Sequence, residues 1–174
     1  MDIKAHQVEI AGVAFHQQTA NIALRMGYTN VGGSGACWRT HVHDCYFGGN
    51  SVGTYAIQAG EIGIDAPCTT IERCFFFDFV TCMAQFNAGY SSSIQDCVFK
   101  QATGSLGIEH LPNGTSRPNA FYFRNKFVCY DPSGTTYGIK VTNTPTAGYV
   151  MIDENTFVGF GADAYCITKR TSGY

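Results

Sequence analysis

Residues 94–99 read Ile94-Gln95-Asp96-Cys97-Val98-Phe99, and this stretch decides the fold. It places an apolar residue first, a small thiol side chain fourth and a phenylalanine sixth. The spacing of the first and sixth positions recurs in five further segments, which are Ile10–Phe15, Val42–Phe47, Ile71–Phe76, Tyr122–Phe127 and Ile152–Phe157. Successive phenylalanines of the six segments are 32, 29, 23, 28 and 30 residues apart. Loops of different length inserted into a fixed repeat unit produce such variation.

A second short segment follows the phenylalanine in every repeat. These segments cover residues 22–24, 55–57, 83–85, 106–108, 137–139 and 165–167. No sustained i, i+3, i+4 pattern supports a helical repeat, and no Asn-Gly or Asp-Gly turn links the paired segments as a β-sandwich requires. We therefore predict an all-β protein, a single-domain parallel β-helix of about six rungs over residues 1–174. The general crossover rule predicts right-handed winding.

Stacked rungs lie about 4.8 Å apart, so equivalent residues form columns along the axis. Inside, we expect a phenylalanine column and, two positions earlier, a column that reads Val13, Cys45, Cys74, Cys97, Asn125, Asn155. The preceding column alternates in charge and reads Gly12, Asp44, Arg73, Asp96, Arg124, Glu154. In the second segment a small column is expected to face outward as a flat strip: Ala23, Ala56, Ala84, Gly107, Gly138, Cys166. Gln85 falls where an apolar residue is expected, which indicates a register shift in the third rung.

Composition excludes several classes of protein. The net charge of −2 gives no basis for binding nucleic acid. No apolar run is long enough for a membrane span, and residues 1–4 lack the pattern of a signal peptide. The eight cysteines form no C-x-x-C pair, so they predict no zinc site and we expect no cofactor. Buried free thiols are the simpler interpretation of the cysteines, although a disulfide within the cysteine column has feasible geometry. Asn113-Gly114-Thr115 matches a glycosylation sequon, to which we give little weight.

The repeated apolar-x-x-Cys/Asn-x-Phe unit resembles the right-handed β-helices of the pectin-lyase-like superfamily, and especially those of bacteriophage tailspikes and related virion proteins. The resemblance implies a structural or receptor-binding module of a virion, a homotrimer that binds host-surface glycan or other virion proteins. The alternative is a polysaccharide depolymerase, either hydrolase or lyase, and a third hypothesis is a glycan-binding module without cleavage. The end-capping helix and trimerising stem of the family are not evident, so we expect loops, another chain or further sequence to cover the ends.

Three groups of residues are candidates for a site. Hydrolysis needs two carboxyls about 5 to 9.5 Å apart, and the candidates are Asp44, Glu72, Asp96, Asp153 and Glu154. Because Asp44 and Asp96 each stack beside an arginine, a structural charge ladder is favoured over catalysis. His41 and His43 share a strand face as metal ligands would, but no third ligand is evident there, so surface histidines are the preferred interpretation. Candidates for carbohydrate binding are Trp38, Tyr90, Glu109, His110 and Tyr122.

Overall fold

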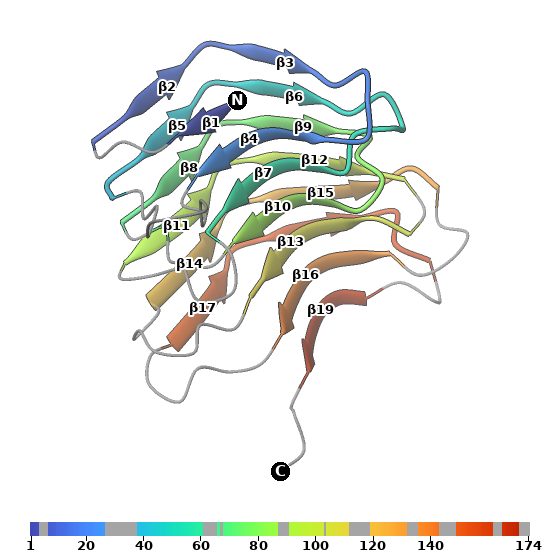
Figure 1. The fold of residues 1–174 in the computed structure, drawn as a ribbon. Helices are drawn as coiled ribbons and strands as arrows, with labels where there is room; N and C mark the ends of the chain where they lie inside the picture. The colour runs from blue at the N-terminus through green and yellow to red at the C-terminus, as the bar shows by residue number, and fades with distance from the viewer. Residues whose placement is uncertain are drawn as a thin grey trace.

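The computed structural model describes residues 1–3, 7–26, 38–60, 66, 68–86, 91–102, 104–111, 119–131, 136–142, 149–161 and 165–170. All regular secondary structure in these ranges is β-strand, and every strand pairing is parallel. The strands stack into a solenoid whose colour runs from blue at one end to red at the other (Figure 1). The predicted fold class, a parallel β-helix, is therefore confirmed.

Three sheets form the walls of the solenoid. Sheet B contains β2 (Glu9–Ala11), β5 (His41–His43), β8 (Thr70–Glu72), β11 (Ser92–Gln95), β14 (Asn119–Phe123) and β17 (Tyr149–Asp153). Sheet C contains β3 (Ala14–His16), β6 (Tyr46–Gly48), β9 (Phe75–Phe77), β12 (Val98–Gln101), β15 (Lys126–Cys129) and β18 (Thr156–Val158). Sheet A contains β1 (Asp2–Ile3), β4 (Ile22–Met26), β7 (Tyr55–Ala59), β10 (Cys82–Phe86), β13 (Leu106–His110), β16 (Tyr137–Thr142) and β19 (Tyr165–Arg170). Each of the six sequence repeats thus supplies one strand to each sheet.

The phenylalanine column forms the predicted aromatic stack in the core. Consecutive rings from Phe15 to Phe157 are stacked with nearly parallel planes, and their centroids are 4.6 to 5.0 Å apart. Phe47, Phe76, Phe99 and Phe127 are fully buried. Each ring of this size contributes a large apolar area, so the stack is the main source of hydrophobic stabilisation on this side of the core.

A two-residue bend separates sheet B from sheet C in every rung. The first residue of the bend has a positive φ throughout, and these residues are Gly12, Asp44, Arg73, Asp96, Arg124 and Glu154. The predicted charge column therefore lies on the bends and not on a strand. The left-handed conformation costs a non-glycine residue about 1–2 kcal/mol. In five of the six rungs the residue after this tight turn is a cysteine or asparagine, and the turn points it into the core; in the first rung it is the exposed Val13.

The cysteine and asparagine column lies inside the bend as predicted, and it hydrogen-bonds along the axis. The Asn125 side chain accepts from the Cys97 backbone N–H at 3.1 Å and donates to the Ile94 carbonyl at 2.9 Å. Asn155 accepts from the Asn125 N–H at 2.9 Å. The column satisfies backbone groups that a bend leaves unpaired. Cys45, Cys74 and Cys97 are buried free thiols, and only Val13, at the end of the column, is exposed.

The structure confirms one expectation for sheet A and corrects another. The register shift predicted in the third rung is one residue, because Ala84 pairs with Ile57 and Ile108, so Met83 takes the place in the small column that the alignment gave to Ala84. The prediction that this column faces outward is wrong, because the column faces inward and forms no flat outer strip. Its members Ala23, Ala56 and Met83 are buried, and a Cβ added at Gly107 would lie 2.7 Å from the Phe127 ring. The side chain of the last expected member, Cys166, lies outside the described residues.

The strand register explains the error. The strands of sheet A pair at the positions before and after this column but not at the column itself, so the β-ladder is interrupted there. Both the small residue and the one after it, such as Ala56 and Ile57, are buried. Simple alternation of faces therefore fails at this point of every rung. The next position returns to the outside, where Gln58, Glu109 and Lys140 are partly exposed.

Candidate functional site

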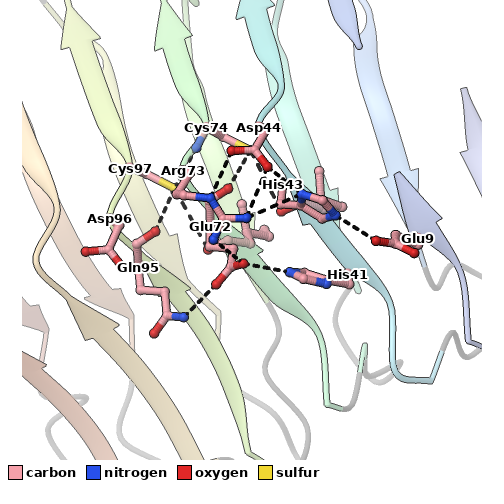
Figure 2. A network of polar contacts seen from close by, with 12 residues as sticks. Glu9, His41, His43, Asp44, Glu72, Arg73, Cys74, Gln95, Asp96 and Cys97 are labelled. Atoms are coloured by element: carbon pink, nitrogen blue, oxygen red, sulfur yellow. Dashed lines mark hydrogen bonds and ion pairs between the residues drawn. The ribbon is translucent and has the colours of Figure 1, made fainter. Parts of the chain in front are cut away.

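A polar network on the outer face of sheet B, extending onto the neighbouring bends, is the most developed cluster of chemical groups in the described residues (Figure 2). His41 and His43 lie on the same face of β5 because they are two residues apart. Glu9 on β2 pairs in register with His41, and Glu72 on β8 pairs with His43. Three successive rungs thus bring together side chains that are far apart in the sequence.

His43 is held at both ring nitrogens. Nε2 lies 2.8 Å from Glu9 Oε1, and Nδ1 lies 2.6 Å from Asp44 Oδ2. The hydrogen bond with Asp44 is the largest cause that raises the pKa of His43 above its ordinary value, and the hydrogen bond with Glu9 is the next largest. The ring is therefore fixed in orientation by two carboxylates.

Arg73 fixes the carboxylates in turn. Its Nε and Nη2 donate to the two oxygens of Asp44 at 2.9 and 3.0 Å, and Nη1 donates to Glu72. The bidentate hydrogen bonds from Arg73 are the main cause that holds the pKa of Asp44 far below its usual range, and the hydrogen bond with His43 lowers it further. The hydrogen bond from Gln95 is the main cause that lowers the pKa of Glu72, with further lowering from Arg73. Both carboxyls are therefore ionised at neutral pH.

Three of the carboxylates considered for catalysis have side-chain partners that lower their pKa values. Arg124 engages Asp96 at 2.8 and 2.9 Å, as Arg73 engages Asp44, and lowers its pKa. Asp153 lies on β17, three strands beyond Glu72 in sheet B, and accepts from the backbone N–H of Glu154 at 2.9 Å. A general acid must carry a proton near neutral pH, and lowered pKa values oppose this at Asp44, Glu72 and Asp96.

His41 and His43 do have a third potential ligand. Ligand atoms of Glu9, His41 and His43 all lie within 4.8 Å of one another. The missed signal was present in the repeat, because aligning Ile10 with Val42 also aligns Glu9 with His41. A fourth group is close, since Glu72 Oε1 lies 3.1 Å from His41 Nε2.

The residues considered for carbohydrate binding are dispersed. Trp38 is exposed before β5, and Tyr90 lies outside the described residues. His110 and Tyr122 are fully buried and are joined by a 2.7 Å contact between Nδ1 and the hydroxyl, so their assignment to a surface site is wrong. Both belong to inward columns of their sheets. The Asn113 sequon also lies outside the described residues.

Glu109 is in an outward polar row on sheet A. Gln58 donates to Gln85 at 2.7 Å, and Gln85 donates to Glu109 Oε2 at 3.1 Å. Lys140 donates to Glu109 Oε1 at 3.2 Å. The row runs along the solenoid axis across four strands. Gln85 is buried within it, whereas Gln58, Glu109 and Lys140 are partly exposed.

The outer face of sheet C was not singled out from the sequence. It carries aromatic and aliphatic side chains, together with Lys100, whose ammonium group lies over the Phe77 and Tyr130 rings. Tyr46 and Phe75 stack with ring centroids 5.7 Å apart. Phe77 and Tyr130 pack against each other at 6.1 Å. Phe75, Tyr130 and Val158 are exposed. We call Tyr46, Phe75, Phe77, Tyr130 and Val158 the sheet C patch. The sequence signal for this face was the alternation of inward and outward residues in each short strand, which places these side chains on the outside.

Comparison with known proteins leaves the fold as the only assignment: no family model, curated protein or solved structure matches this chain. The fold itself is a parallel β-solenoid. Among the described residues we find no helix with the length and apolar character that a membrane span needs.

Proposed function

We propose that this solenoid is a structural or receptor-binding module of a bacteriophage particle, without enzymatic activity, and that it works as a homotrimer. The sheet C patch is the observation that carries the proposal. Exposed aromatic and aliphatic side chains gathered on one sheet face are typical of subunit contacts. The virion assignment draws on the resemblance of the repeated Cys/Asn-x-Phe unit to tailspike β-helices.

The rigidity of the outer charges also supports a structural role. Two bidentate pairs, Arg73 with Asp44 and Arg124 with Asp96, connect neighbouring bends. Exposed ion pairs add little to stability, but opposite charges in adjacent rungs favour one register over another. We therefore assign these carboxylates to fixing the register of the rungs, since their lowered pKa values disfavour a role as general acids.

Oligomeric state tests the proposal directly. Light scattering coupled to size-exclusion chromatography should give about three times the 18.9 kDa chain mass. Phe75→Ser together with Val158→Ser should shift the protein toward monomer. Met151→Ser is the matched control, because Met151 is also exposed but lies on sheet B. A wild-type monomer at all concentrations, or equal dissociation by the control, would contradict the trimer.

Glycan binding is supported by a second observation, the outward row on sheet A. Amide and charged groups aligned along the axis can hydrogen-bond successive hydroxyls of an extended polysaccharide. Glu109→Gln and Lys140→Met should weaken retention on immobilised host capsule or lipopolysaccharide, whereas Met151→Ser should leave it unchanged. The depolymerase alternative predicts release of reducing ends or unsaturated uronates, and loss of that release in Asp44→Asn or Asp96→Asn.

A further inference from the structure

We infer that Glu9, His41 and His43 form a binding site for a divalent transition-metal ion of the Zn²⁺ class on the outer face of sheet B. Two imidazoles and one carboxylate are a donor set that binds such ions, with a further coordination position left for water. The donors come from adjacent strands β2 and β5, which the solenoid holds in fixed register. Metal binding at this place is independent of the proposed role of the sheet C patch.

The distances suit closure around one ion. Donor atoms bound to tetrahedral zinc lie about 3.4 Å apart, as bond lengths of about 2.0–2.2 Å require. In the structure the three donor atoms are within 4.8 Å, and the nearest two, His43 Nε2 and Glu9 Oε1, are 2.8 Å apart. The His41 and His43 ring centroids are 4.4 Å apart. Small side-chain rotations bring all three donors to bonding distance, and the ion replaces the proton shared by His43 and Glu9.

Groups around the donors orient them as supporting residues do in metal sites. The Asp44 carboxylate at 2.6 Å from Nδ1 of His43 leaves Nε2 directed at Glu9. A carboxylate on the far nitrogen fixes the tautomer of a metal-bound imidazole and strengthens it as a ligand. Arg73 holds Asp44 with two hydrogen bonds, so this support is itself rigid.

Charge and access also favour a cation. Three carboxylates, those of Glu9, Asp44 and Glu72, surround the histidines, and Arg73 is the cation that contacts two of them. A dication would reduce this excess of negative charge. The side chains of Glu9 and His41 are 70% and 40% exposed, whereas Nε2 of His41 is itself buried, so an ion would reach the donors from the side of the exposed Glu9 carboxylate.

The competing explanation is a surface network of ion pairs that binds no metal, and titration calorimetry separates the two. The full chain, stripped with a chelator and kept reduced, is titrated with ZnCl₂, and CoCl₂ absorption reports the ligand type. We expect one ion per chain. Glu9→Gln and His43→Ala should each weaken binding about tenfold or more, and Asp44→Asn about 10–100-fold. His16→Ala is the matched control, because His16 is exposed on β3 of sheet C and should leave affinity unchanged.

Three results would overturn the site. The first is that Zn²⁺ shows no saturable binding up to about 100 µM, because a site with three protein ligands should bind more tightly than that. The second is equal affinity in Glu9→Gln and wild type. The third is a strong thiolate-to-cobalt charge-transfer band, which would assign the ion to cysteines. Far-UV circular dichroism checks that each variant is folded. Because Glu9→Gln preserves shape at an exposed position, it decides the question if His43→Ala does not fold.

Discussion

Acid should destabilise this protein through one buried histidine. His110 on β13 is fully buried, and Nδ1 contacts the Tyr122 hydroxyl at 2.7 Å. Nε2 is buried and has no hydrogen-bond partner among the described residues. Burial disfavours the charged ring and lowers the pKa of His110 from 6.5 to about 4. The folded protein therefore resists a proton that the unfolded chain accepts.

The size of the effect follows from this difference in pKa. One pKa unit corresponds to about 1.4 kcal/mol, so lowering the pKa from 6.5 to about 4 corresponds to about 3 kcal/mol. The contribution of His110 to the free energy of unfolding is complete above pH 6.5 and is lost as the pH falls toward about 4. At about pH 4.5 the loss should be about 2.5 kcal/mol relative to neutral pH.

Urea unfolding of wild type and His110→Met at about pH 7.5 and 4.5 isolates this contribution. Methionine is the matched replacement, because Met26 occupies the equivalent column in β4 and is fully buried. Other groups that titrate over this pH range, including His43, do so in both proteins, and their contributions cancel in the comparison. Wild type should lose about 2.5 kcal/mol more than the variant. Equal losses, within about 0.5 kcal/mol, would refute the reasoning and show that His110 titrates normally.

Three further predictions concern the core. Phe99→Ala removes one ring from the middle of the stack and should lower the free energy of unfolding by about 3–5 kcal/mol in urea titrations; a loss below about 1 kcal/mol would show that the stack is not tightly packed. Gly107→Ala places a methyl group 2.5 Å from the Gly138 carbonyl oxygen and 2.7 Å from the Phe127 ring and should cost about 1–3 kcal/mol, measured by thermal unfolding, whereas a Gly107 with open space around it would tolerate alanine. Asn125→Ala leaves the buried Ile94 carbonyl and Cys97 N–H without their side-chain partner and should cost at least about 2 kcal/mol, while Asn125→Cys, which extends the cysteine column, should cost less in the same urea assay; equal costs would mean that the column does not act as a ladder.

Much of the fold could be read from the repeated unit. An apolar residue, a bend and a phenylalanine recur because every rung must bury the same two faces at the same corner. The phenylalanine stack and the Cys/Asn column follow from that constraint alone. The alternating charges at Asp44, Arg73, Asp96 and Arg124 also paired as the column order indicates.

The candidate site depended on the winding of the chain. Glu9 and His43 are separated by 34 residues, and only the stacking of β2 on β5 brings Glu9 Oε1 to 2.8 Å from the ring. The aligned repeats place Glu9 beside His41, but they do not show that the Glu9 carboxylate reaches the His43 ring. Side-chain convergence depends on rotamers and on partners such as Asp44, which spacing does not encode.

Sequence alone determined the repeat, the corner between sheets B and C and the residues that stack there, because local pattern and burial agree at those positions. The tertiary structure decided which way sheet A faces. Alternation predicted an outward Ala/Gly strip, but the interrupted ladder turns Gly107 toward Phe127 and leaves His110 in the core. Where two adjacent residues are both buried, period-two reasoning has no parity to follow, and only the packed neighbours settle the orientation.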